Sequence, residues 1–124
     1  MSPRRNLPPE LADALEMVAP GTDLRDGIDN IIRASNGALV VVANQYKLER
    51  MNIVSGGMKI GLEFSPMRLY ELAKMDGAIV VSPDLSMIHY VNVYLTPDAT
   101  LESDETGTRH LAGHRTARQT GDLV

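Results

Sequence analysis

The stretch Lys74-Met75-Asp76-Gly77-Ala78-Ile79-Val80-Val81-Ser82 decides the fold of this chain. An amphipathic segment from Ser65 to Met75 ends here, an acidic residue and a glycine follow, and a wholly apolar run of strand type begins at once. The pattern places Asp76 at a junction between a helix and a strand. Aspartate and glycine often end helices for structural reasons alone. A carboxylate beside a flexible glycine is also a suitable place for chemistry, because a ligand can approach the backbone closely there.

On either side of this junction, apolar residues recur with the spacing of helices and strands. Helical spacing, with Thr22 and Ser65 as N-caps and Pro66 in the first turn, predicts helices over 11–19, 22–32 and 65–75. A final helix over 108–120 is also expected, but its apolar stripe is poor and Gly113 lies inside it, so it is not expected to form without tertiary contacts. Strand patterns cover 38–43, 58–64, 78–81 and 87–95. Residues 1–9 are proline-rich and are expected to form a loose terminus, and 44–52 show no clear pattern.

The expected strands differ in which of their faces are apolar. Residues 38–43 are apolar on both faces, which is typical of a central strand covered by helices on either side. Residues 58–64 alternate as in a half-buried strand, although Gly61 weakens that pattern. Strands 78–81 and 87–95 are expected to pair as a hairpin. In the second of these, one side is predicted to carry Met87, His89, Val91, Val93 and Leu95.

The alternation of strands and helices predicts the fold class. It indicates an α/β or α+β domain with a mixed central β-sheet flanked by helices. The length of 124 residues suits one domain, 1–124, with its own core.

Composition limits the environment and the partners. The chain contains no cysteine, so disulfides and thiolate metal sites are excluded and a cytoplasmic location is expected. A net charge of −4 argues against a general nucleic-acid surface, and no direct DNA binding is expected. No apolar run approaches the roughly 20 residues of a membrane helix, and no apolar region of a signal peptide follows the first charged residues.

A second informative motif is Asp104-Glu105-Thr106-Gly107-Thr108-Arg109-His110. A glycine and a hydroxyl open an expected helix, and two side chains that can carry positive charge lie in its first turn. Free backbone N–H groups and the helix dipole attract phosphate at such a position, and arginine can bind it in a bidentate way. Taken alone, a loop of this kind more often caps a helix than binds phosphate.

Together the two motifs resemble those of diadenylate cyclase domains, most closely the branch found at the N-terminus of DNA integrity scanning proteins. Asp76-Gly77-Ala78 and Gly107-Thr108-Arg109-His110 correspond to the DGA and RHR motifs of this family. The resemblance covers nearly the whole chain. It also includes Ala19-Pro20-Gly21-Thr22, Leu24-Arg25-Asp26-Gly27, Gly37-Ala38-Leu39-Val40-Val41, Arg68-Leu69-Tyr70-Glu71-Leu72-Ala73-Lys74-Met75 and Gln119-Thr120-Gly121.

The resemblance implies a specific activity. Family members condense two ATP molecules into cyclic di-AMP and release pyrophosphate, with two subunits facing each other and each holding one nucleotide. The implied partners are therefore ATP and a further copy of the chain, in a dimer or larger oligomer, and the implied cofactor is Mg²⁺ or Mn²⁺.

The resemblance also implies a role for each motif residue. Asp76 would bind the metal and activate the ribose 3′-hydroxyl, and Gly77 and Ala78 would line the nucleotide. Gly107, Thr108, Arg109 and His110 would hold the phosphates, with Arg109 and His110 acting as catalytic residues beside Asp76. This division agrees with phosphoryl transfer in general, where a protein mainly aligns the reactants and neutralises charge.

The chain departs from the family pattern in two respects. Leu111 stands where the motif has its last arginine, and the chain ends at Val124, whereas family members continue into further strands of the sheet. His114 or Arg115, one turn further along, is a possible substitute for the arginine. A catalytically weakened nucleotide-binding or regulatory module therefore stays open as the alternative. His110 and His114 also have the spacing of zinc ligands on a helix, but a third ligand and the glutamate of the zincin motif are missing.

Overall fold

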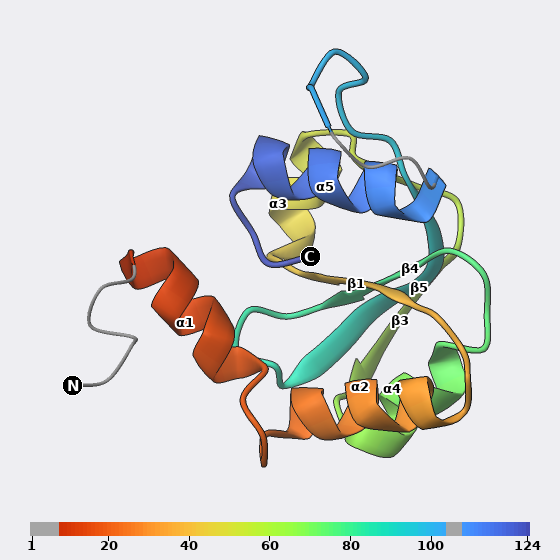
Figure 1. The fold of residues 1–124 in the computed structure, drawn as a ribbon. Helices are drawn as coiled ribbons and strands as arrows, with labels where there is room; N and C mark the ends of the chain where they lie inside the picture. The colour runs from red at the N-terminus through yellow and green to blue at the C-terminus, as the bar shows by residue number, and fades with distance from the viewer. Residues whose placement is uncertain (1–7, 104–107) are drawn as a thin grey trace.

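A mixed five-stranded sheet lies between two layers of helices in the computed structural model, which describes residues 8–103 and 108–124 (Figure 1). The strands are β1 (Leu39–Val42), β2 (Val54–Ser55), β3 (Met58–Glu63), β4 (Ala78–Val81) and β5 (Met87–Leu95). Their order is β1-β4-β5-β2, and β3 also pairs with β5. β1 and β4 are parallel, and the pairs that involve β5 are antiparallel. The predicted class, a mixed sheet flanked by helices, is confirmed.

The helices cover both faces of this sheet. They are α1 (Pro9–Met17), α2 (Asp23–Arg33), α3 (Gln45–Arg50), α4 (Pro66–Leu72) and α5 (Thr108–Thr120). Figure 1 shows α2 and α4 on one face, α3 and α5 on the other, and α1 reaching away from the sheet. In the described part of the chain, no helix has the length and apolar character needed to cross a membrane.

Each face of the sheet carries its own apolar core. On the α2 and α4 side the buried residues are Leu24, Ile31, Val42, Phe64, Leu69, Ala73, Ile79, Val81, Ile88 and Val91. On the α3 side they are Val41, Ala43, Leu48, Ile53, Ala78, Val80 and Val93. β4 contributes to both groups and is buried along its whole length, because it lies between β1 and β5 under two helix layers.

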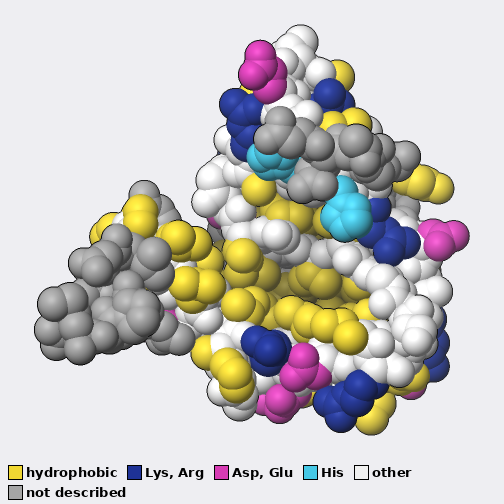
Figure 2. Space-filling view, in the orientation of Figure 1, with side chains coloured by type: hydrophobic (Ala, Val, Ile, Leu, Met, Phe, Trp, Pro, Cys, Tyr) yellow, Lys and Arg dark blue, Asp and Glu magenta, His cyan; other side chains and the backbone are white. Residues whose placement is uncertain are grey.

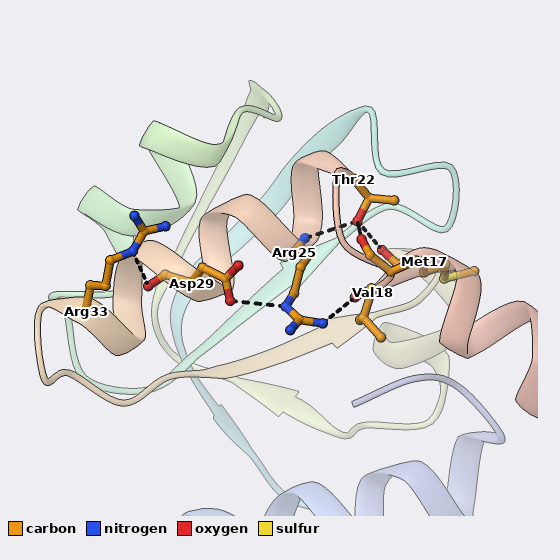
Figure 3. Close-up of polar contacts among 7 residues, drawn as sticks. Met17, Val18, Thr22, Arg25, Asp29 and Arg33 are labelled. Carbon is orange, nitrogen blue, oxygen red and sulfur yellow. Dashed lines mark hydrogen bonds and ion pairs between the residues drawn. The ribbon is translucent and has the colours of Figure 1, made fainter.

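The predicted helix starts are confirmed by capping hydrogen bonds. The Thr22 hydroxyl accepts from the Arg25 N–H at 3.3 Å, and the Ser65 hydroxyl accepts from the Arg68 N–H at 3.1 Å. Figure 3 shows the corner between α1 and α2, which contains the Thr22 cap. Here the Arg25 guanidinium donates to the Val18 carbonyl at 3.0 Å and to the Asp29 carboxylate at 3.1 Å. The angle between the two helices is therefore held by polar contacts.

Two expectations about the strands are wrong. β1 is apolar on both faces as predicted, but it is not central, since it pairs with β4 and otherwise only through an isolated bridge between Val42 and Leu123 among the described residues. β5 does not keep one face: Val91 packs in the core under α2 and α4, whereas Val93 packs in the core under α3. Irregular pairing within β5 causes this change of face.

Regular structure also forms at two places where the sequence pattern is unclear or weakened. Residues 45–50 form α3, capped by Asn44, whose side-chain oxygen accepts from the N–H groups of Tyr46 and Lys47. Gly61 lies within β3 at a φ of 58°, where the pairing register between β3 and β5 shifts. A glycine at a bulge is compatible with a strand, because the bulge needs a left-handed residue.

Candidate functional site

Asp76 lies at the junction that its sequence context predicts. α4 ends at Leu72, a short turn follows, and β4 begins at Ala78. Asp76 is exposed in this turn, and Gly77 adopts a φ of 87°, a left-handed conformation that favours glycine. The carboxylate therefore sits in front of the amino end of β4, open to solvent.

The register between β1 and β4 brings a second loop beside this one. Leu39 pairs with Ala78 in parallel, so the residues two positions earlier, Gly37 and Asp76, precede neighbouring strands at the same end of the sheet. Gly37 belongs to the loop that leads from α2 into β1. The loops carrying Gly37 and Asp76 thus enter the sheet side by side.

Arg109 reaches the same place from the opposite helix layer. A Cβ atom added to Gly37 would lie 2.5 Å from Nη1 of Arg109, so the guanidinium rests directly against Gly37. Within the described residues, neither Asp76 nor Arg109 takes part in an ion pair. The fold therefore gathers a carboxylate and a guanidinium, distant in sequence and without an ion-pair partner in the described part of the chain, at the amino ends of β1 and β4.

His110 follows Arg109 on α5 and lines an apolar groove next to this cluster. The groove has a volume of about 570 Å³ and runs between α2, β1 and α5. Figure 2 shows it as a hydrophobic hollow with histidine side chains along one rim. Its polar lining consists of Asn36, His110 and His114. Because the floor is apolar, phosphate charge would have to be held at the rim, where His110 and Arg109 lie.

The two residues proposed as substitutes for a motif arginine already have partners. Nδ1 of His114 lies 2.7 Å from the Ser103 hydroxyl, and Nε of Arg115 donates to the Leu101 carbonyl at 3.1 Å. Both hold the segment before α5 against the helix. Leu111 is half-buried. Use of His114 or Arg115 at the phosphates would cost these contacts.

The other predicted site residues are Ala78, Gly107 and Thr108. Ala78 is buried at the start of β4. α5 begins at Thr108 as predicted. Gly107 and the preceding Asp104 to Thr106 lie outside the described residues. Asn36-Gly37 has the sequence signal of a turn, and nothing local in the sequence marks Gly37 as a neighbour of Arg109.

Two groups with shifted pKa values lie away from the site. Hydrogen bonds from the hydroxyls of Ser82 and Ser86 lower the pKa of Asp84 to about 2, and this turn lies at the carboxyl end of β4, opposite Asp76. A hydrogen bond to Glu49 raises the pKa of Tyr90 to about 12. These groups stabilise a turn and the contact between α3 and β5, and neither belongs to the site.

Asp76 is the carboxylate that this site would offer to a divalent cation. No group of three or more histidine, aspartate or glutamate residues arranged for a metal is present among the described residues. Mg²⁺ is commonly bound by one or two carboxylates with phosphates and water completing its shell. The exposed Asp76 carboxylate fits that role when a phosphate lies near Arg109.

Comparison with protein families decides the assignment. Residues 25–124 match the family model described as DAC, DisA bacterial checkpoint controller nucleotide-binding. The chain belongs to this family. The predicted resemblance to diadenylate cyclase domains is thereby confirmed.

Similar proteins support the DAC assignment along most of the chain. DNA integrity scanning protein DisA of Acetivibrio thermocellus is 48% identical over 93% of this chain and 31% of the relative, and the Clostridium kluyveri protein is 49% identical over 93% and 32%. The Thermotoga maritima protein is 45% identical over 95% and 33%. The chain thus spans about a third of the length of these relatives.

A solved structure supports the fold alone. The crystal structure of a protein described as a hypothetical membrane spanning protein from Bacillus cereus superposes with a TM-score of 0.70 at 20% identity. It covers 91% of this chain and 58% of the other. The agreement confirms the arrangement of a mixed sheet flanked by helices.

Proposed function

We propose that this DAC domain binds ATP with Mg²⁺ or Mn²⁺ and condenses two ATP molecules into cyclic di-AMP, with release of pyrophosphate. The observation that carries the proposal is the meeting of the Asp76 loop and Arg109 around Gly37. A carboxylate and a guanidinium at one edge of an apolar groove match the two needs of nucleotidyl transfer, a metal ligand and a phosphate clamp.

Arg109 and His110 would bind the triphosphate. Arg109 is exposed and can present its N–H groups to a phosphate in a bidentate way. Both residues lie in the first turn of α5, where the positive end of the helix dipole adds to their attraction. Gly77 and Ala78 would line the nucleotide, since a glycine leaves the backbone of this loop accessible.

Asp76 would act at the other reactant. The carboxylate would hold the metal and accept the proton of the ribose 3′-hydroxyl as that oxygen attacks the α-phosphorus of the second ATP. The new bond joins the 3′-oxygen to phosphorus, and the bond to the departing pyrophosphate breaks. A bound Mg²⁺ or Mn²⁺ would lower the charge on the phosphates during this exchange.

The reaction requires two sites, because each ATP supplies one hydroxyl and one phosphorus. A two-fold pair of copies would present two identical sites to each other and make both bonds with the same residues. Self-association into a dimer or larger oligomer is therefore part of the proposal.

Incubation of the protein with ATP and Mn²⁺, followed by chromatography and mass spectrometry for cyclic di-AMP, tests the activity. Asp76→Asn is the matched control, since it keeps the size of an exposed side chain but removes its charge. We expect product from the wild-type chain only. Retained ATP binding without any product would refute the cyclase and leave a binding domain.

That second function, a nucleotide-binding or regulatory module, is favoured by one observation. Leu111 replaces a guanidinium of the family motif, and the nearby Arg115 is already bonded to the Leu101 carbonyl. A missing charge-assisted contact in a transition state can cost about 1.5–3 kcal/mol, or roughly ten- to a hundredfold in rate. Turnover restored by Leu111→Arg would identify the cause.

A further inference from the structure

Asn92 has a left-handed backbone in the middle of β5, with a φ of 54°. The pairing with β4 is irregular at this point: Ala78 lies opposite Val93, but Val80 lies opposite Tyr90. Between these two pairs β5 advances by three residues and β4 by two, so β5 contains one extra residue, which is a β-bulge. Asparagine is among the few residues other than glycine that adopt this conformation readily.

The bulge changes what each face of β5 carries. Val91 and Val93 are two positions apart and would share a face in a regular strand. Instead, they belong to the two cores on opposite faces of the sheet. Both cores therefore depend on the extra residue at Asn92.

Two glycines lie against the backbone of Asn92. A Cβ atom added to Gly77 would lie 2.8 Å from the carbonyl carbon of Asn92 and 2.8 Å from the carbonyl oxygen of Val93. One added to Gly57 would lie 2.6 Å from the carbonyl oxygens of Val91 and Asn92. Because the contacted atoms are backbone, they cannot move aside as a side chain can. The loop that carries Asp76 is thus seated directly on the bulge.

We propose that Asn92 is a positioning residue for the Asp76 loop. Its left-handed backbone shapes the surface on which Gly77 rests, and this fixes where the Asp76 carboxylate stands relative to Arg109. The consequence for nucleotide binding rests on the proposed function, whereas the coupling between Asn92 and Gly77 does not. A residue that disfavours the left-handed conformation would pull β5 toward a regular strand and shift its contact with Gly77.

Two variants at Asn92 separate the backbone from the side chain. Asn92→Gly keeps the left-handed conformation without a side chain, and Asn92→Ala keeps a small side chain but disfavours that conformation. We expect Asn92→Gly to bind ATP with Mn²⁺ as the wild type does and Asn92→Ala to bind about tenfold more weakly. Hydrogen exchange at the amides of Gly77 and Ala78 should be faster in Asn92→Ala by a similar factor and unchanged in Asn92→Gly.

Ile88→Val is the control for a general loss of stability. Ile88 is buried in the same strand, in the core under α2 and α4, and pairs with Val81 at the opposite end of β4 from Gly77. If Ile88→Val weakens ATP binding and speeds Gly77 exchange as much as Asn92→Ala does, the positioning role is refuted. Equal losses in Asn92→Gly and Asn92→Ala would refute it too, because the side chain and not the backbone would then matter.

The exchange measurement keeps this inference apart from the proposed function. If the wild-type chain binds no ATP, the proposed function fails, and faster Gly77 exchange in Asn92→Ala alone would still support the coupling. Unchanged exchange in Asn92→Ala would overturn the inference whether or not ATP binds.

Discussion

Gly27→Ala tests the packing that sets the two site loops relative to each other. α2 leads into the Gly37 loop and α4 leads into the Asp76 loop, and the two helices pack closely. Gly27 is buried in this contact. A Cβ atom added to it would lie 2.8 Å from Cδ2 and 3.3 Å from Cβ of Leu69, and 3.4 Å from Cα of Pro66. The glycine thus permits the close approach.

Two opposing effects decide the result. Alanine in a helix interior gains about 1 kcal/mol over glycine. Overpacking of a well-packed core costs about 1–3 kcal/mol. Since Leu69 is fully buried and its Cβ is also crowded, a change of its rotamer can relieve only part of the clash. We expect the cost to exceed the gain, with a net loss in the free energy of unfolding of about 1 kcal/mol.

Urea denaturation of a double-mutant cycle with Leu69→Ala measures this balance. Leu69→Ala alone is expected to cost about 2–5 kcal/mol. In that background the contact with Cδ2 at 2.8 Å is removed and only the contact with Cβ at 3.3 Å remains, so Gly27→Ala should become neutral or stabilising by up to about 1 kcal/mol. A milder Leu69→Val background serves if the alanine variant does not fold. Stabilisation by Gly27→Ala in the wild-type chain, or the same effect in both backgrounds, would refute the packing argument.

Three further predictions concern the site and the turn opposite it. Asp76→Asn should abolish Mn²⁺-dependent cyclic di-AMP formation and change the free energy of unfolding by less than about 0.5 kcal/mol, as urea denaturation can verify, because the side chain is exposed. Leu111→Arg should tighten ATP binding about tenfold in calorimetry; no change would mean that the motif arginine is dispensable here. The stabilising contribution of Asp84 is fully present above its ordinary pKa of 3.8 and is lost as the pH falls toward about 2, since Ser82 and Ser86 hydrogen-bond its ionised form. Asp84→Asn should therefore flatten the acid limb of the stability profile, and an unchanged limb in circular dichroism would contradict that assignment.

The sequence by itself determined the elements around the site. Periodicity and caps located α2 and α4, and the apolar runs located β1 and β4, whereas α5 was expected to depend on tertiary contacts. These signals are local: a capping hydroxyl bonds within its own turn, and a strand buried on both faces is apolar throughout. The same local signals placed Asp76 at a helix-to-strand junction and Arg109 in the first turn of a helix, and the motif pair predicted the family.

Tertiary structure alone decided how these elements meet. Sheet order placed β1 beside β4, and its other edge makes only an isolated bridge to Leu123 within residues 8–103 and 108–124, although its composition is that of a central strand. The bulge at Asn92 turned Val91 and Val93 to opposite faces, because pairing with β4 and seating of Gly77 override simple alternation.

The site depends both on local sequence signals and on tertiary structure. Sequence marked Asp76-Gly77-Ala78 as a helix-to-strand junction with a motif, but no local rule places Arg109 beside Gly37. That contact exists because parallel pairing aligns Gly37 with Asp76 and α5 packs over the same end of the sheet. Contacts between residues far apart in the chain arise from the packing of the whole domain, and only the folded structure contains them.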